Sequence, residues 1–251
     1  MEVHHHSHAE SPPAGRAGKK WHHYFWEFFM LFLAVTLGFL VENQREHFVE
    51  HKREIQYIRS YIEDLHTDIK QLDSMVGHCK ERNQMADSLI FMLDSAVQKY
   101  GSSIYYYARQ LTLNFPFFSN DRTIQQLKNG GNLRLISKQT VSNAMMNYDH
   151  QIRWLDDIRS REEDYVRDYV RSLEQVFDPR VFDKMIKPGF GFIRPEGNPH
   201  LIKEDRTTIL EFIGKLHFLK SANSYLMLNY EKTIQTAQET LAVIKKEYNL
   251  E

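Results

Sequence analysis

The sequence predicts an all-α protein, in which one N-terminal transmembrane helix continues into a bundle of long helices with coiled-coil character. Three observations lead to this fold class. Glycine and proline are sparse, at 11 and 7 of 251 residues, and they cluster in a few places. The stretches between them are rich in helix-forming residues, and their apolar side chains recur in steps of three and four. No run of alternating apolar and polar residues is bounded by turns, so we expect no substantial sheet.

The charge balance and the cysteine content narrow the class of protein. The formal net charge is -1, from 32 basic and 33 acidic side chains. A nucleic-acid-binding domain normally presents a basic face, so we expect no nucleic-acid partner. The single cysteine, Cys79, excludes a scaffold built on internal disulfides.

A long apolar stretch near the N-terminus organises the chain. The 18 residues from Tyr24 to Val41 would span about 27 Å as a helix, close to the thickness of the hydrocarbon core of a bilayer. Trp21 and Trp26 lie at its start, where aromatic rings gather at a membrane interface. We therefore expect a transmembrane anchor over residues 21–42, with the lipid bilayer as a partner.

Residues 1–20 form a polar tail with several histidines and a Ser-Pro-Pro sequence. We expect this tail to be disordered, because it cannot build a core. Basic residues flank both sides of the anchor in equal number, so the charge count does not fix its orientation. A basic segment before a single apolar helix is typical of an uncleaved signal anchor. We therefore expect the tail inside the cell and a helical bundle, residues 43–251, outside the cytoplasm.

Glu27 is the one charge inside the apolar stretch. A carboxylate deep in lipid is costly and often functional. Glu27 lies one turn into the stretch, and His23 is four residues earlier on the same helix face. Two interpretations stay open: the carboxylate reaches the membrane interface, or it contacts a partner helix.

The chain then predicts one long helix over about residues 43–100, continuous with the anchor. Its apolar residues form a heptad seam. The residues at the a and d positions of this seam include Ile55, Ile62, Leu65, Ile69, Leu72, Val76, Ile90, Leu93 and Val97. This pattern favours a parallel two-stranded coil, and Asn83 falls at an a position, where a buried amide can fix the register of an oligomer. Tyr61, Met75 and Leu89 at g positions widen the stripe and favour a bundle instead. We prefer the bundle, and both arrangements can hold in one homo-oligomer.

His47, Glu50 and His51 fit the H-x-x-E-H pattern of inverted zinc peptidases. The two histidines would share a helix face, with the glutamate as base. The helix emerges directly from the predicted membrane span, and the region is dense in glutamate, histidine and arginine. A chance match explains the pattern better, so we expect no metal, no cofactor and no catalytic residue.

A turn region follows the first long helix. Gly101 is expected to end that helix, as glycine commonly does. A shorter helix then carries Tyr105, Tyr106 and Tyr107. These tyrosines form either a face of the bundle or an aromatic cleft for a ligand.

The next residues read as a tight corner between two helices. Asn120 or Asp121 caps a short helix, Gly130 closes it, and Ser137 caps the next helix. The helix-corner motif consists of Leu127, Gly130, Gly131, Asn132 and Leu133. Its glycines lack the spacing of a phosphate-binding loop, so the motif needs no ligand.

Several features together resemble a known family. They are Glu27 in the anchor, Glu42-Asn43-Gln44-Arg45-Glu46 just after it, Glu63-Asp64-Leu65, and the box from Leu127 to Ile136. From about residue 24 onward, the chain is similar to an uncharacterised family of bacterial membrane-anchored helical proteins. The resemblance supports the single N-terminal anchor and the helical fold. Together with the orientation expected above, it leads us to expect a single-pass protein of a bacterial inner membrane with the bulk of the chain in the periplasm. It implies no catalytic residues.

Two more long helices are predicted, over residues 138–177 and 205–248, each with an apolar stripe that faces a core. A charged stretch around Arg159 to Asp164 reads as a solvated face. Residues 178–204 form an irregular segment rich in proline and glycine. This segment either recognises a protein partner or caps the end of its own bundle.

Three functions are compatible with these patterns. The favoured one is a non-enzymatic, membrane-anchored scaffold or protein-interaction protein that forms a homo-oligomer. The second is a small-molecule sensor bundle that relays its signal through a membrane partner. The third and weakest is a metal-dependent enzyme that uses His47, Glu50 and His51.

Overall fold

The computed structural model describes residues 17–95, 97–189 and 191–250, and these ranges contain six α-helices and no β-strand. An isolated antiparallel bridge joins Ile186 and Phe192. The all-α prediction is therefore confirmed. The tail was predicted to be disordered over residues 1–20. Residues 1–16 lie outside the described residues, whereas residues 17–20 belong to α1, so the helix begins earlier than predicted.

Three helices are long, and their bounds agree closely with the prediction: α1 (Ala17–Ser95), α4 (Gln139–Val176) and α6 (Arg206–Tyr248). As predicted, one helix, α1, contains both the apolar stretch and the first long helix after it. The shorter elements are η1 (Val97–Lys99), α2 (Gly101–Gln110), α3 (Arg122–Asn129), η2 (Asn132–Leu135) and α5 (Pro179–Lys184).

The chain divides into two compact units, Met1–Arg53 and Glu54–Glu251. In the first unit, every described residue is helical. The large apolar side chains from Trp21 to Val41 are exposed on all sides of this helix. By length and composition it is the one helix in the described residues that is able to cross a membrane.

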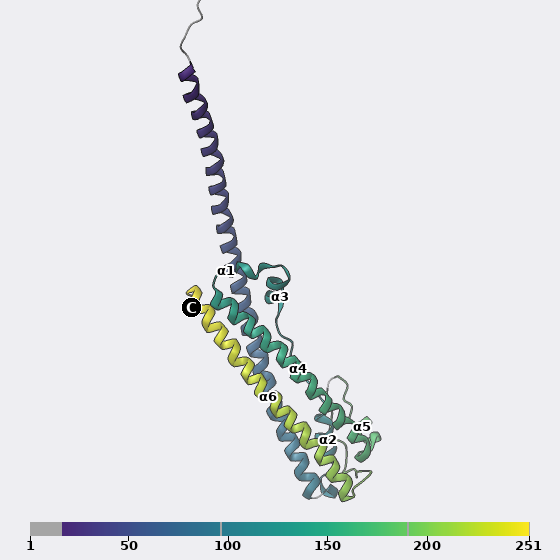
Figure 1. Ribbon diagram of the computed structural model, residues 1–251. Coiled ribbons are helices and arrows are strands. Elements are labelled where there is room, and N and C mark those ends of the chain that lie inside the picture. Colours follow the sequence, from purple (N-terminus) through teal and green to yellow (C-terminus); the bar gives the residue numbers. More distant parts are fainter. Residues whose placement is uncertain (1–16, 96, 190, 251) are drawn as a thin grey trace, which may run out of the picture. The chain divides into compact units, whose positions relative to one another are not determined.

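The second unit is a bundle of three long helices: α1 from Glu54 onward, α4 and α6 (Figure 1). Three core clusters follow one another along this bundle. The first cluster joins Ile58 with Met145 and Ile244. The second, in the middle, joins Leu72 with Leu155 and Leu226. The third joins Leu89 with Leu173 and Phe212. Residue numbers rise together along α1 and α4 and fall along α6, so α1 and α4 run in the same direction and α6 runs opposite.

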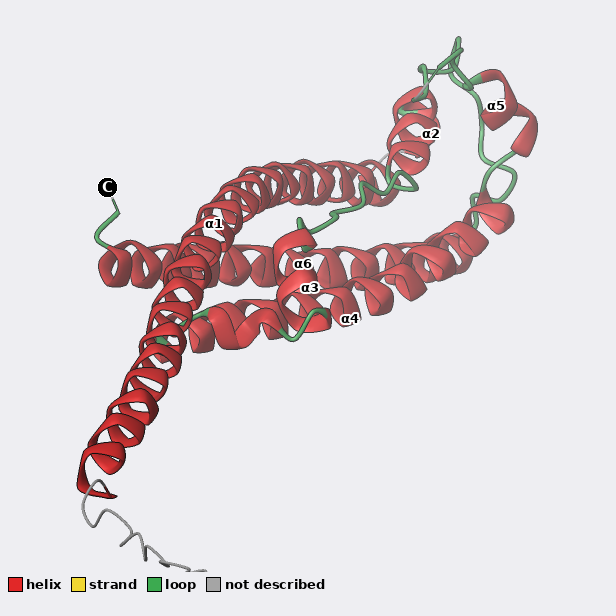
Figure 2. Ribbon diagram, turned by 90° about the horizontal axis from the view of Figure 1, so that it is seen from above, coloured by secondary structure: helices red, strands yellow, loops and turns green. Residues whose placement is uncertain are grey.

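Because α1 and α4 run in the same direction, the chain must return along the bundle between them. Residues 111–138, which we call the return segment, make this crossover and include α3 and η2 (Figure 2). Leu111 packs in the cluster around Leu89, Phe117 packs in the middle cluster, and Leu127 packs in the cluster around Ile58. The return segment therefore contributes to all three parts of the core.

The buried stripe of α1 is centred on the d and g positions. Leu65, Tyr61 and Leu89 are at most 2% exposed, whereas Ile62 and Ile69 at a positions are only half-buried. A bare two-stranded coil would bury the a and d positions. The wide stripe is used within one chain, as expected of a bundle helix.

Two predicted helix ends differ from the structure. Gly101 does not end α1, which stops earlier, but is the first residue of α2. A Cβ atom at this position would lie 2.1 Å from the carbonyl oxygen of Pro199, so the close backbone approach requires glycine. Ser137 does not cap α4, whose N-cap is Lys138. Ser137 instead binds a carboxylate of α1, described below. The predicted start of the last long helix at residue 205 is close to the observed one, where Asp205 is the N-cap of α6 and accepts a hydrogen bond from its first turn.

Residues 178–204 pack on α2 at one end of the bundle. The Tyr105 hydroxyl accepts a hydrogen bond from the Asp178 nitrogen at 2.9 Å and donates one to the His200 carbonyl at 3.0 Å. The Ser102 hydroxyl donates to the Pro195 carbonyl at 2.9 Å. The segment thus caps its own bundle, one of the two predicted interpretations. Its role in binding a partner stays a prediction.

Candidate functional site

The predicted anchor residues lie on the exposed apolar part of α1. Trp21, Tyr24 and Trp26 are all more than 60% exposed. Glu27 Oε1 lies 3.1 Å from His23 Nε2, so the two side chains meet on one helix face as their spacing predicts. This contact stays within one helix, and the role of Glu27 in assembly stays a prediction.

His47, Glu50 and His51 lie on α1 within the first unit. Across the described ranges, no group of three histidine, cysteine, aspartate or glutamate side chains is arranged to hold a metal ion. The zinc interpretation therefore gains no support from the geometry of those residues.

Asn83 contacts α6. Its Nδ2 donates to Ser224 Oγ at 2.9 Å, and its Oδ1 accepts from Asn223 Nδ2 at 2.8 Å. The same Asn223 nitrogen donates to the Cys79 carbonyl at 2.9 Å. This network holds α1 in register with α6 inside one chain. The predicted role of Asn83 in the register of an oligomer stays a prediction.

The helix-corner motif forms the turn from α3 to η2. Leu127 is fully buried and Gly130 is the C-cap of α3. Gly131 has a φ of 63°, a left-handed conformation that glycine adopts without steric cost. Asn132 donates to a tyrosine hydroxyl of α1 at 3.4 Å, and Leu133 packs on the same cluster as Leu127. The structure therefore brings the five motif residues together at one corner of the core.

The tyrosines of α2 are covered by the chain itself. Tyr105 is fully buried, with its ring edge-on to Phe177 at 5.0 Å between centroids. The guanidinium of Arg194 lies over the ring of Tyr106 at 4.4 Å. These contacts agree with the bundle-face interpretation, and the aromatic cleft stays a prediction.

Buried carboxylates on α1, which we did not predict, hold the return segment in place. Asp68 accepts hydrogen bonds from the Asn120 nitrogen at 2.7 Å and from the Tyr148 hydroxyl at 2.8 Å. Asp64 accepts from the nitrogen and the hydroxyl of Thr123, at 3.3 and 2.5 Å. Both carboxylates are at most 3% exposed. Since Thr123 lies in the first turn of α3, Asp64 caps that helix from outside.

Glu54, which precedes Asp64 and Asp68 on α1, makes the third attachment. It accepts hydrogen bonds from the nitrogen and the hydroxyl of Ser137, both at 2.7 Å, and from the Tyr248 hydroxyl at 2.5 Å. Burial of Tyr248 and its bond to this carboxylate raise the pKa of the phenol. Successive carboxylates along α1 thus bind successive points of the return segment, which runs in the opposite direction.

A buried ion pair fixes the start of the same segment. Arg82 Nη1 donates to Glu162 Oε1 at 2.6 Å, and their side chains are 13% and 2% exposed. Arg82 Nη2 donates to the Leu111 carbonyl at 3.2 Å, and Arg159 donates to the Phe117 carbonyl at 2.8 Å. The predicted solvated face is therefore wrong for Glu162, because a charge that is matched by a partner can be buried.

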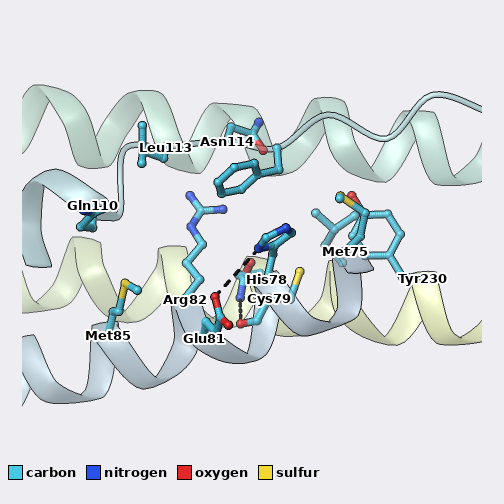
Figure 3. A pocket seen from close by; sticks show the side chains of 13 residues that line it. Met75, His78, Cys79, Glu81, Arg82, Met85, Gln110, Leu113, Asn114 and Tyr230 are labelled. Atoms are coloured by element: carbon cyan, nitrogen blue, oxygen red, sulfur yellow. Dashed lines mark hydrogen bonds and ion pairs between the residues drawn. The ribbon is translucent and has the colours of Figure 1, made fainter. Parts of the chain in front are cut away.

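A cavity of about 190 Å³ lies under the return segment (Figure 3). It is lined by residues of α1, α2, α6 and the return segment, among them Cys79, Arg82, Leu113 and Tyr230. The rings of His78 and Phe115 stack at its side, 4.3 Å apart and within 11° of parallel. Burial raises the pKa of the Cys79 thiol to about 11, so the thiol stays protonated at neutral pH.

The outer groove between α4 and α6 carries exposed aromatic side chains. Tyr165 on α4 and Phe218 and Tyr225 on α6 line one hollow of this groove, and they are 44%, 60% and 52% exposed. A second hollow further along shares Phe218. Large exposed aromatics that gather on one face are typical of interaction surfaces.

Comparison of the chain with protein-family models, with curated proteins and with solved structures finds no match. The resemblance to a family of bacterial membrane-anchored helical proteins therefore stays a prediction. The function must be argued from the anchor, the cavity and the groove.

Proposed function

We propose that the chain is a non-enzymatic, membrane-anchored helical scaffold that assembles with further copies of itself. The observation that carries the proposal is the first unit, in which apolar side chains are exposed on every side of a helix. Water disfavours such a surface, and a bilayer accepts it. The anchor therefore tethers the bundle to a membrane.

Membrane extraction of the full chain tests the anchor. We expect the protein to stay with the membrane in alkaline carbonate and to leave it only in detergent. The Leu33→Asp/Leu37→Asp double variant places two charges in the span and should be released or degraded, since each carboxylate at the centre of a helix opposes insertion by about 2.5–3.5 kcal/mol. A full-length protein that is freely soluble without detergent would overturn the proposal.

We place the tail inside the cell and the bundle outside the cytoplasm, in a bacterial inner membrane. The support is the basic segment before a single apolar helix. In a Cys79→Ser background, the Ser74→Cys variant puts an exposed thiol on the bundle and the Ser11→Cys variant puts one in the tail. In spheroplasts, a membrane-impermeant maleimide should label only the first. Labelling of the tail alone would reverse the orientation.

The groove between α4 and α6 is the surface that we assign to assembly. The exposed charges that line it balance in number, with Arg161, Arg171 and Lys215 on one side of the count and Asp164, Asp168 and Glu211 on the other. A second copy brings the same neutral, aromatic surface, so the two can pack without net repulsion. Tethering in one membrane also raises the effective concentration of neighbouring copies.

The molecular mass of the full chain in detergent tests this assembly. We expect a multiple of the 29.9 kDa chain mass. The Phe218→Ser/Tyr225→Ser variant should shift the protein to the monomer. The Phe91→Ser variant removes an equally exposed ring on α1 and should leave the mass unchanged. A wild-type monomer, or an oligomer that ignores the groove variant, would contradict the assignment.

A further inference from the structure

Two arginine side chains rest on aromatic rings where residues 178–204 pack on α2. The guanidinium carbon of Arg109 lies 5.5 Å from the ring centroid of Phe182 and 4.5 Å from that of Phe192. The guanidinium carbon of Arg194 lies 4.4 Å from the ring centroid of Tyr106. A cation over an aromatic ring is attracted by the electrons of the ring face, so these rings hold both guanidiniums in place.

The two guanidiniums share one face of α2. Ser103, Tyr106 and Arg109 are spaced three residues apart, so their side chains lie along one side of this helix. Arg194 reaches the same side, because its Nη1 donates to Ser103 Oγ at 2.9 Å and its guanidinium lies over Tyr106. This surface, which we call the arginine face, therefore carries two positive charges.

The arginine face has no counter-charge in the described part of the chain. Within these residues, Arg194 forms its one side-chain hydrogen bond with the neutral Ser103 hydroxyl, and Arg109 forms none. The carboxylate of Asp178, at the start of the segment that packs here, is already bound to Arg180. Two like charges on one surface repel each other, and an anion from outside the chain would relieve this repulsion.

The accessible atoms of these arginines limit how an anion can bind. Arg194 is exposed and Arg109 is half-buried, with its Nε out of reach, so contacts would use the terminal nitrogens of each guanidinium. That edge of a guanidinium matches the two oxygens of a carboxylate or a phosphate. Because the two guanidiniums rest on different rings, each takes an anionic group of its own. Two singly charged carboxylates suit this arrangement better than one phosphate.

We propose that the arginine face binds an acidic segment of a partner protein, with one carboxylate on Arg109 and another on Arg194. In an extended peptide, alternate residues point to the same side, so one segment can present both carboxylates. Surfaces of opposite charge steer partners together, and arginine and tyrosine often dominate the binding energy of an interface. The site uses neither the anchor nor the groove between α4 and α6, so it is independent of the self-assembly proposed above.

Fluorescein-labelled peptides test the proposal on the full chain in nanodiscs of neutral phosphatidylcholine. The acidic probe is Gly-Glu-Ser-Glu-Gly-amide, and the reference probe has glutamine in place of both glutamates. Fluorescence anisotropy at low salt, where surface charges are screened least, gives the Kd of each peptide. The acidic peptide should bind at least about tenfold more tightly than the glutamine peptide, as expected when charge-assisted hydrogen bonds form.

Arginine variants locate the binding. Arg109→Gln and Arg194→Gln should each weaken binding of the acidic peptide about tenfold or more, because each removes one charged donor group. Arg134→Gln is the matched control, since it removes the same charge from an exposed arginine of η2 and should leave the Kd unchanged. If Arg109→Gln fails to fold, as circular dichroism would show, Arg194→Gln at its exposed position and the two peptides decide.

Four results would overturn the proposal. Equal binding of the two peptides, or an equal loss in the Arg134→Gln variant, would leave only unspecific charge attraction. Displacement of the acidic peptide by free glutarate at the peptide's own Kd would make the ligand a small dicarboxylate. Tighter binding of a peptide with phosphoserine at both glutamate positions would make the recognised group a phosphate.

Discussion

Asp64 and Thr123 form a helix cap between two elements that are distant in sequence. The carboxylate of α1 accepts both the backbone nitrogen and the hydroxyl of Thr123, in the first turn of α3. The local cap residue, Asp121, makes no such side-chain bond. Asp64, a buried residue of the longest helix, therefore accepts the capping hydrogen bonds that the residue just before a helix usually accepts.

The Asp64→Ala variant should lose about 1–3 kcal/mol of unfolding free energy, because it leaves buried donors of α3 unpaired. Thermal unfolding of the full chain in detergent, followed by circular dichroism, measures the loss. The adjacent Glu63→Ala variant is the control, since Glu63 is exposed and should change the stability by less than about 0.5 kcal/mol. Equal effects of both variants would argue against the cap.

Breaking the buried ion pair should cost more. The Glu162→Ala variant leaves Arg82 buried without its partner, and we expect a loss of about 3–5 kcal/mol. The Glu163→Ala variant removes an exposed carboxylate one residue along α4 and should be nearly neutral. Chemical denaturation of both variants gives the comparison, and a loss below about 1 kcal/mol for Glu162→Ala would refute the role of the pair.

Two glycines should respond in opposite ways to alanine. Gly77 lies exposed within α1 with open space around it, so Gly77→Ala should stabilise the protein by about 0.5–1 kcal/mol. Gly101→Ala places a Cβ against the Pro199 carbonyl and should cost about 1–3 kcal/mol.

Limited proteolysis gives a second readout for these glycines. Cleavage within residues 195–204 should accelerate in the Gly101→Ala variant, because that part of the chain can no longer pack closely on α2. It should not accelerate in the Gly77→Ala variant. Equal cleavage of both proteins would show that the close backbone approach at Gly101 is unimportant.

Asp68 gives the stability a pH dependence of known sign. Burial raises the pKa of this carboxyl above its ordinary value of 3.8, although hydrogen bonds from Asn120 and Tyr148 oppose the shift. The folded state therefore holds a proton that the unfolded chain has released, and this contribution to stability is lost as the pH rises from about 4 through the raised pKa.

The Asp68→Asn variant removes this titration. Its stability relative to the wild type should increase as the pH is raised from 4 to 7, which the difference in melting temperature at each pH measures. The Asp73→Asn variant, at an exposed position of α1, should show no such trend. A pH-independent difference for Asp68→Asn would contradict the raised pKa.

The sequence was sufficient for the long helices, because each has a continuous apolar stripe and flanking glycine, proline or capping residues. It was also sufficient for two helix ends, since Gly130 is the C-cap of α3 and Asp205 is the N-cap of α6. Gly101 was assigned to the wrong element because glycine is permitted in many places. Glycine is required at this position because the backbone of Pro199, a residue almost a hundred positions away, approaches it closely.

The buried charges on α1 are visible in the heptad pattern of the sequence. Glu54, Asp68 and Arg82 occupy g positions, alternating with the apolar g residues that widen the stripe. A charge within a buried stripe must be paired. Its partner, however, depends on the direction of the return segment, which no local pattern specifies. The cavity depends on the same crossover and was invisible for the same reason.

The attachment of the return segment also constrains how this chain can vary. Asn120 and Ser137 are held partly through main-chain nitrogens, which every amino acid except proline supplies. Mutational drift at these two positions should therefore be tolerated, with proline as the one forbidden outcome. The acceptors Asp68 and Glu54 are side-chain carboxylates, which most other amino acids cannot replace. The path of the return segment is therefore determined more by residues of α1 than by its own residues.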